Sequence, residues 1–255
     1  MKILLTNDDG IHAPGLAALV EAVAGLGEIT VVAPEAEMSA VGHAITLTDP
    51  LKVKEYNKNG KFFGYAVDGT PADCVKIAAW ALFKDQPAPD LLISGINLGA
   101  NTGINTIYSG TVSAATEGAI LGIPSFAVSL ATFKNPDFSA AAEFARYLAP
   151  LMIKQKLPAG VYLNVNVPAV PRSQIKGIQI TRQSKANYRE EYHVRTDPRN
   201  NKYYWLTGEK INIEKEEDVD DRAILDNKIS VMPIHYDLTH YQSLDSMRQW
   251  DLQWK

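Results

Sequence analysis

The sequence predicts a doubly wound α/β fold with a mostly parallel sheet, followed by a β-rich extension toward the C-terminus. Over residues 1–157, short apolar runs alternate with helix-like segments, a rhythm typical of βα units whose strands lie parallel and buried. Beyond Pro158 the apolar residues recur with a period of two, as they do in strands. We therefore expect a core at residues 1–157 and an extension at residues 158–255, part of which could complete the core.

The elements of the core follow from local signals. Residues 3–6 are an apolar first strand, and Pro14 opens a helix that ends at about residue 26, between Gly25 and Gly27. A polar run at residues 56–61 is the expected turn of a peripheral hairpin between residues 47 and 67. The remaining strands are expected at residues 29–33, 91–93 and 125–129, and two helices at residues 111–120 and 140–151.

One further helix of the core has a clear start signal. Thr70 can cap a helix that begins at Pro71 with Asp73 in its first turn. Apolar residues at helical spacing then follow at Val75, Ile77, Trp80 and Phe83. We expect this helix to be buried.

The extension is expected to contain strands at residues 161–167 and 178–180, and a hairpin whose strands, 203–206 and 210–213, flank a turn at Thr207 and Gly208. Residues 185–199 carry charged and aromatic side chains with little apolar periodicity, so we expect an arm that packs on another subunit. The acidic residues 214–221 are expected to form a solvated loop before a short helix at residues 222–225, in preference to a metal cluster.

Composition narrows the classes of protein. In 255 residues, 46% are hydrophobic and 21% charged, with no biased tract, so an ordered globular protein is expected. The net charge of −4 and the lack of a Lys/Arg cluster argue against a nucleic-acid partner. A small anionic substrate is still compatible with this charge, because a bound cation and a helix N-terminus supply a positive field locally.

The number of cysteines and the N-terminal sequence indicate the cellular compartment of the protein. Cys74 is the single cysteine, which excludes an intrachain disulfide and a thiolate zinc cluster and suits a reducing cytosol. Met1 leads directly into the first strand, whose apolar stretch is interrupted by Asp8 and Asp9. We therefore expect neither a signal peptide nor a membrane span, and a cytoplasmic protein.

Oxygen-bearing side chains follow three of the predicted strands. Asp8 and Asp9 come after the first strand, Ser39 lies in the loop after the second, and Asn97 follows the strand at 91–93. Ligands of open α/β sheets collect at the carboxyl ends of the strands, and hard divalent cations prefer oxygen ligands. These four residues therefore predict a metal site with positions open to water or substrate. The plainer alternative is that the two aspartates only shape a turn.

A phosphate site is predicted beside the metal. Asn101, Ser109, Gly110 and Thr111 belong to a glycine- and hydroxyl-rich segment that opens a helix. Backbone N–H groups at a helix N-terminus, together with hydroxyls, bind phosphate oxygens. The alternative is that Ser109 simply caps the helix and the glycines permit turns.

Other functional classes lack their motifs. The turn after the first strand has no glycine triplet for a dinucleotide, no P-loop occurs, and Ser94 lacks the flanking glycines of a hydrolase nucleophile elbow. Zinc is less suited than a hard cation, so His12 and His43 are expected to be structural or to support the site from outside the ligand set. The other three histidines are expected to serve packing or the surface: His193, His235 and His240.

Four blocks of the chain are distinctive: ILLTNDDGIHAPG at residues 3–15, MSAVGHAITL at 38–47, VDGTPADCV at 67–75, and PDLLISGINLGANTGINTIYSGTVSAATEG at 89–118. Through these blocks the chain closely resembles the SurE survival-protein family of metal-dependent nucleotidases. A weaker fifth block spans residues 218–233, where Ser-Val-Met-Pro replaces the family's Ser-Ile-Thr-Pro. Ala40 also departs from the glycine that many relatives have after the serine.

The resemblance implies a Rossmann-like core, with an arm and a C-terminal tail that are exchanged between subunits of a homodimer or homotetramer. It implies metal ligation by Asp8, Asp9, Ser39 and Asn97. It also implies that Asn101, Ser109, Gly110 and Thr111 line the phosphate side. The implied activity is hydrolysis of nucleoside 5′- and 3′-monophosphates.

The expected reaction uses one divalent cation per subunit, Mg²⁺ or Mn²⁺, with Ca²⁺ also compatible, as Lewis acid and organiser of in-line attack. Asp8 and Asp9 are the expected catalytic residues. The sequence leaves open whether Asp8 attacks phosphorus or only holds the ion. Alternatives are an exopolyphosphatase, another phosphate-ester hydrolase, or a non-catalytic nucleotide sensor that uses the same pocket.

Overall fold

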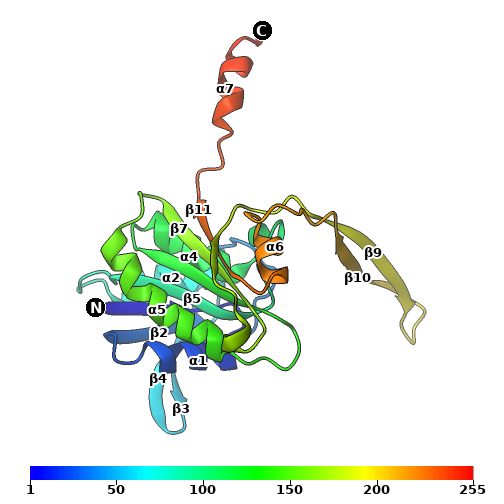
Figure 1. The fold of residues 1–255 in the computed structure, drawn as a ribbon. Coiled ribbons are helices and arrows are strands. Elements are labelled where there is room, and N and C mark those ends of the chain that lie inside the picture. The colour runs from blue at the N-terminus through cyan, green and yellow to red at the C-terminus, as the bar shows by residue number, and fades with distance from the viewer. Residues whose placement is uncertain (255) are drawn as a thin grey trace.

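The computed structural model describes residues 1–254 and confirms the predicted α/β fold (Figure 1). A nine-stranded sheet has the order β3-β4-β2-β1-β5-β6-β7-β11-β8, and a separate pair is formed by β9 and β10. The strands are β1 (Lys2–Thr6), β2 (Glu28–Pro34), β3 (Val53–Lys58), β4 (Lys61–Val67), β5 (Leu91–Leu98), β6 (Ser125–Ala131), β7 (Val161–Pro168), β8 (Ile178–Ile180), β9 (Asn187–Thr196), β10 (Lys202–Ile211) and β11 (Ile229–His235). The helices are α1 (Pro14–Val23), α2 (Pro71–Ile77), the π-helical η1 (Ala78–Leu82), α3 (Asn105–Tyr108), α4 (Gly110–Ile120), α5 (Ser139–Gln155), the 3₁₀ turn η2 (Arg172–Gln174), α6 (Asp220–Leu225) and α7 (Tyr241–Arg248).

The run β4-β2-β1-β5-β6-β7 is parallel, whereas β3 and β11 pair antiparallel with β4 and β7. From β1 the chain first builds the sheet toward β2 and β4, and then returns to add β5, β6 and β7 on the other side. The strand order therefore reverses between β1 and β5, which is where open α/β sheets form their ligand crevice.

Alternation along the strands divides the core into two layers. Ile3 and Leu5 of β1 face a cluster with α1 and α5, whereas Leu4 faces a cluster with α2 and α4. The same alternation places Ile93 and Leu92 of β5 on opposite faces. Because both faces are covered by helices, the central strands are apolar throughout, as the sequence indicated.

The helix that follows the Thr70 cap is less buried than expected. Its start is confirmed, since the Thr70 hydroxyl accepts from the Asp73 N–H at 3.1 Å and the Asp73 carboxylate accepts from the Thr70 N–H at 3.0 Å. After α2 the helix widens into η1. Trp80 is 70% exposed there, so the prediction that it packs in the core is wrong.

Three strands from beyond residue 157 lie in the main sheet. β7 pairs with β6, β11 pairs with β7, and the short β8 forms the far edge. At the opposite edge, β3 and β4 form the hairpin expected between residues 47 and 67, with its turn at Asn59 and Gly60. The sheet thus unites both halves of the sequence.

β9 and β10 form an arm that extends away from the sheet (Figure 1). The predicted turn at Thr207 and Gly208 is wrong, because β10 runs through these residues and Thr207 pairs with Glu191. The chain turns instead at residues 197–201, where the Asp197 carboxylate accepts from the N–H groups of Arg199 and Asn201, each at 2.8 Å. A local turn signal was outweighed by the ladder of a longer hairpin.

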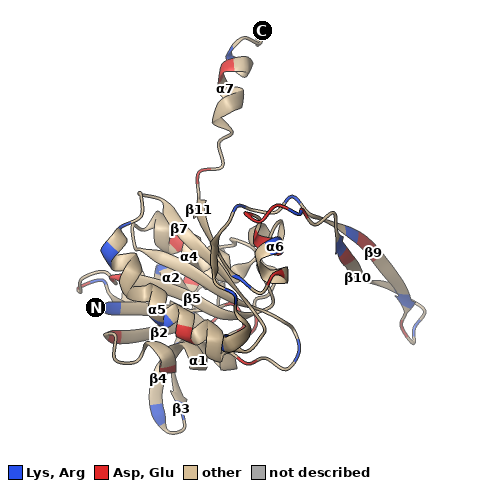
Figure 2. Cartoon of the chain, viewed as in Figure 1, with Lys and Arg blue, Asp and Glu red and all other residues tan. Residues whose placement is uncertain are grey.

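The last segment, with α7, also projects from the sheet (Figure 1) and buries none of its helical residues. Most of its apolar side chains are exposed, among them Leu238, Trp250 and Leu252. Lys and Arg are interspersed with Asp and Glu along the chain (Figure 2). Among residues 1–254, no helix has the length and apolar character needed to cross a lipid bilayer.

Candidate functional site

The reversal of strand order brings the predicted metal ligands to one edge of the sheet. Asp8 and Asp9 follow β1, and Asn97 lies near the end of the neighbouring β5. The turn after Asp9 is held by Asn7, whose Nδ2 donates to the Gly10 carbonyl at 3.0 Å. The backbone carbonyl of Asp8 accepts from the Met38 N–H at 2.7 Å, which places the loop carrying Ser39 beside the two aspartates.

The predicted metal ligands lie in or beside a cavity of about 520 Å³. Three of the four predicted metal ligands line it: Asp8, Ser39 and Asn97. Asp9 lies next to it, because its Oδ2 is 3.4 Å from the N–H of Leu98, a residue of the cavity lining. The structure therefore brings three of the four side chains into one cavity and leaves Asp9 at its border.

The charged forms of Asp8 and Asp9 are disfavoured in the folded protein. Burial raises the pKa of Asp8, although hydrogen bonds from Thr111 act in the opposite direction. Burial, and next the charge of Asp8, raise the pKa of Asp9 to about 7. Neighbouring acids that are costly to ionise are relieved by a bound cation, so this pair suits a metal.

The neutral members of the predicted set have oxygen lone pairs to offer. Asn97 donates through Nδ2 to the Gly99 carbonyl at 2.7 Å, which orients the amide and leaves Oδ1 for another partner. The Ser39 hydroxyl donates to Oε1 of Glu37 at 2.6 Å, so its lone pairs can still accept a cation. Two acids and two neutral oxygens are donors that suit a hard divalent ion, and the residues fit such an ion.

The residues predicted to bind phosphate do not all face the cavity. Ser109 and Asn101 line the cavity. Ser109 is also the N-cap of α4, since its Oγ accepts from the Val112 N–H at 3.1 Å. Thr111 is fully buried and its hydroxyl donates to Oδ1 of Asp8. Thr111 therefore contacts an expected metal ligand, and its hydroxyl is engaged before any phosphate arrives.

Gly110, the first residue of α4, borders the carboxylate of Asp8. A methyl group at this position would be 2.8 Å from Cβ and 3.0 Å from Oδ2 of Asp8. The missing side chain keeps open the space beside Oδ2. Most residue types are accepted at the start of a helix, so the close approach of Asp8 explains why this position is a glycine.

Sequence reasoning missed a buried polar network that supports Asn101. The Asn101 N–H donates to Oδ1 of Asn166 at 2.8 Å, and its carbonyl accepts from Nδ2 of Asn164 at 2.7 Å. Its own Nδ2 donates to Oγ of Ser129 at 2.9 Å. The signal was present, because Asn164 and Asn166 interrupt the apolar β7, and polar groups buried in a strand require partners.

The loop after Ser39 is held by an ion-pair cluster. Nε2 of His43 lies 2.9 Å from Oε2 of Glu117, and Nζ of Lys76 lies 2.7 Å from Oε1. Burial alone would raise the pKa of Glu117, but the bonds from His43 and Lys76 outweigh it and hold the pKa below its ordinary value. The expected structural role of His43 thus takes the form of pinning this loop to α4.

Two acidic residues of the stretch 214–221, Asp220 and Asp221, are buried, so the expectation of a solvated loop is wrong for them. Asp220 accepts from the N–H groups of Gly103 and Ser184, at 2.8 and 3.0 Å. Asp221 pairs with Nζ of Lys210 at 2.5 Å. These acids tie the loop after Asn101 to the base of the arm.

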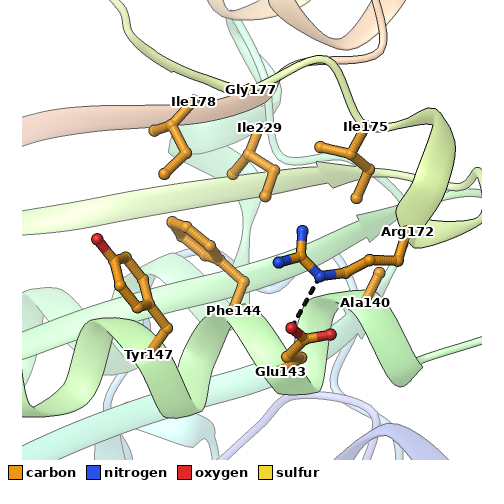
Figure 3. A pocket seen from close by; sticks show the side chains of 9 residues that line it. All are labelled: Ala140, Glu143, Phe144, Tyr147, Arg172, Ile175, Gly177, Ile178 and Ile229. Atoms are coloured by element: carbon orange, nitrogen blue, oxygen red, sulfur yellow. Dashed lines mark hydrogen bonds and ion pairs between the residues drawn. The ribbon is translucent and has the colours of Figure 1, made fainter.

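A second pocket, of about 280 Å³, lies between α5 and the β8–β11 edge (Figure 3). Phe144 of α5 faces Ile178 and Ile229, and an Arg172–Glu143 pair with an N···O distance of 2.8 Å lies at one side. None of the predicted metal or phosphate residues lines this pocket. We therefore place the candidate site in the cavity at the carboxyl ends of β1 and β5, which most of the predicted residues line.

Comparisons with known proteins identify chains that are similar to this one over nearly its full length. The family model "Survival protein SurE" matches residues 3–190. The chain is 52% identical over 252 residues to 5′-nucleotidase SurE of Syntrophobacter fumaroxidans, covering 99% of this chain and 100% of that protein. It is 53% identical over 249 residues to 5′-nucleotidase SurE of Syntrophus aciditrophicus, covering 97% and 93%. The crystal structure of SurE protein from Aquifex aeolicus superposes with a TM-score of 0.85 at 41% identity, covering 97% of this chain and 98% of that one.

Proposed function

Because this chain belongs to the SurE family, we propose that it is a 5′-nucleotidase, which hydrolyses nucleoside 5′-monophosphates to nucleoside and phosphate. The observation that carries the proposal is that Asp8, Ser39 and Asn97 line one cavity, with Asp9 at its border. The near full-length relatives named as 5′-nucleotidases support the reaction class. We extend the proposal to nucleoside 3′-monophosphates, whose phosphate would meet the same donors.

The proposal includes one divalent cation per subunit, Mg²⁺ or Mn²⁺, with Ca²⁺ also suited to the oxygen donors. Asp8, Asp9, Ser39 and Asn97 would hold it. When bound, such an ion supplies Lewis-acid stabilisation of a phosphoryl oxygen. The burial of both carboxylates and the charge of Asp8 beside Asp9 support this assignment, because both carboxylates are costly to ionise without a cation.

The residues of the chain would orient the phosphate. Asn101 and Ser109 line the cavity, and the N-terminal end of α4 directs its positive dipole toward this region. The Thr111 hydroxyl orients Asp8 through Oδ1. Asp8 is thus positioned either to attack phosphorus or to hold the ion, and both roles need a carboxylate.

We also propose a cytoplasmic homodimer or homotetramer, in which the arm and the tail contact another subunit. The exposed apolar side chains of the tail support this, because a single chain leaves them in water.

The activity is tested by phosphate release from AMP. Purified protein should release phosphate with added Mg²⁺ or Mn²⁺, should lose activity in excess EDTA, and should regain it when the metal is restored. Activity retained in EDTA would contradict the metal site. Binding of AMP without phosphate release under any cation would favour a nucleotide sensor, and preferential cleavage of short polyphosphate would favour an exopolyphosphatase.

A second prediction concerns pH and thermal stability. The folded pKa of Asp9 is about 7, above the ordinary value of 3.8, so the folded protein holds this proton more tightly than the unfolded chain. The corresponding stability is present at low pH and is lost as the pH rises from about 4 to about 7. Asp8 acts in the same direction.

We therefore expect the Tm of metal-free protein to fall between about pH 5 and about pH 8. Added Mn²⁺ should raise the Tm more at the higher pH, where protons no longer compete for the carboxylates. Differential scanning calorimetry measures both effects. Asp9→Asn should reduce the pH dependence and the Mn²⁺ shift, and an unchanged Mn²⁺ shift in this variant would place the cation elsewhere.

A further inference from the structure

We propose that the nucleobase of the substrate lies against an aromatic wall formed by Tyr108, Phe133 and Tyr192, so that the arm helps to select the substrate. This inference rests on the proposed nucleotidase function and adds to it a subsite for the base. It makes a phosphomonoester that lacks a base a poor substrate.

The cavity has two chemically different parts. Asp8, Ser39 and Asn97 provide acidic and polar donors, whereas the three aromatic residues and Leu206 provide apolar surface within the same lining. A nucleoside monophosphate has the same division, with an anionic group at one end and a flat ring at the other. A volume of about 520 Å³ lies within the range of sites that hold ligands of this size.

Phe133, from the loop between β6 and α5, places one part of the wall beside the metal site. A Cβ atom added at Gly99 would lie 2.3 Å from Cε1 of the Phe133 ring. The ring therefore rests directly on the backbone of Gly99, two residues beyond Asn97. Gly99 also has φ +111°, so glycine is required there by both the backbone and the ring.

Tyr192 contributes the other part from the arm. It is the cross-strand partner of Leu206, and both residues line the cavity together with Glu190. Residues two apart in a strand share a face, so one face of the arm is turned to the site. Tyr203, paired with Arg195, lies on the opposite face.

The base of the arm is anchored, which keeps this face over the cavity. Nδ2 of Asn105 donates to the Tyr188 hydroxyl at 3.0 Å. Nζ of Lys210 donates to Oγ1 of Thr102 at 3.0 Å and to the Asp221 carboxylate at 2.5 Å. Both strands of the arm are therefore tied to the segment that follows Asn101.

The rings of the wall are accessible to a ligand. Tyr108, Phe133 and Tyr192 are 56%, 78% and 61% exposed. Exposed aromatic faces that flank a polar site are favourable surfaces for stacking, and every base offers a π-face. The wall should therefore accept purines and pyrimidines alike. A contact far from the reacting phosphorus stabilises the bound substrate and the transition state equally. Its loss should therefore raise KM and leave kcat unchanged.

The test compares AMP with ribose 5-phosphate, which carries the same phosphate and sugar without a base. For wild-type protein, kcat/KM should be higher for AMP. Tyr192→Ala and Phe133→Ala should each raise KM for AMP by about tenfold, within the range of base–aromatic stacking, with kcat/KM for ribose 5-phosphate unchanged. Tyr192→Phe, which keeps the ring, should retain the wild-type KM, and Tyr203→Ala is the control on the opposite face.

Adenosine binding, measured by calorimetry, gives a readout that does not depend on catalysis. Tyr192→Ala and Phe133→Ala should weaken it by a similar factor, and Tyr203→Ala should not. Equal losses for AMP and ribose 5-phosphate, or unchanged adenosine binding, would overturn the wall proposal while leaving the nucleotidase intact. Conversely, a wild-type protein that releases no phosphate but binds adenosine through these rings would contradict the proposed reaction and support the wall.

Discussion

Asp8→Asn should reduce phosphate release from AMP by about 10³-fold or more at saturating Mg²⁺ or Mn²⁺. The substitution keeps the size of the side chain and its acceptor for Thr111, but it removes the negative charge at the buried side of the cavity. Whether Asp8 attacks phosphorus or holds the ion, an amide performs neither role well. Initial-rate kinetics with a phosphate assay measures the loss.

The same variant should fold well. Burial raises the pKa of Asp8, so the metal-free fold favours an uncharged group there, and the Tm without metal should be no lower than that of the wild type. Asp68→Asn, an exposed aspartate in the loop after β4, is the control and should keep full activity. Wild-type turnover by Asp8→Asn would remove this cavity as the site of reaction.

Gly110→Ala should reduce kcat/KM by about 10²-fold while the protein remains folded. The added methyl group would be 2.8 Å from Cβ of Asp8 and 3.1 Å from Cγ of Pro71, so the Asp8 side chain must move. Alanine itself is well suited to a helix start. The effect should therefore appear in the chemistry and in metal affinity more than in the Tm.

Kinetics and scanning calorimetry on the same preparation separate these outcomes. Ser139→Ala places alanine at the first residue of α5, which is exposed and far in sequence from the site, and should behave as wild type in both measurements. Full activity in Gly110→Ala would mean that Oδ2 of Asp8 does not need the space beside it. Loss of folding in Gly110→Ala would mean that the close contact with Asp8 and Pro71 cannot relax.

Local signals were sufficient for much of the fold. The strand at residues 3–6, the helix opened by Pro14 and the cap at Thr70 all form where the sequence predicted them. They depend on neighbours within one or two turns, such as a proline at a first helical position or a hydroxyl three residues before a free N–H. Such contacts are encoded in adjacent residues.

The errors also have physical explanations. Thr207 and Gly208 have turn-forming residue types, yet they lie within β10 because the ladder with β9 continues past them. Trp80 has the spacing of a core residue, yet it is exposed after the helix widens. The acidic stretch was interpreted by charge alone, whereas Asp220 finds backbone donors in distant segments. For the turn and for Asp220, a partner elsewhere in the sequence decided the outcome.

By itself the sequence determined where the oxygen donors lie along the chain: Asp8 and Asp9 after the first strand, Ser39 after the second, and Asn97 after the strand predicted at residues 91–93. It also determined that Ser109 could cap a helix. These are properties of short segments and of the period of their apolar residues.

Only the tertiary structure decided what these groups contact. It placed Thr111 on Asp8, surrounded Asn101 with Asn164 and Asn166, and turned Tyr192 of the arm toward the cavity. The physical reason is that such contacts join residues many positions apart. They depend on strand order and register, which arise from the packing of the whole sheet and not from any single segment.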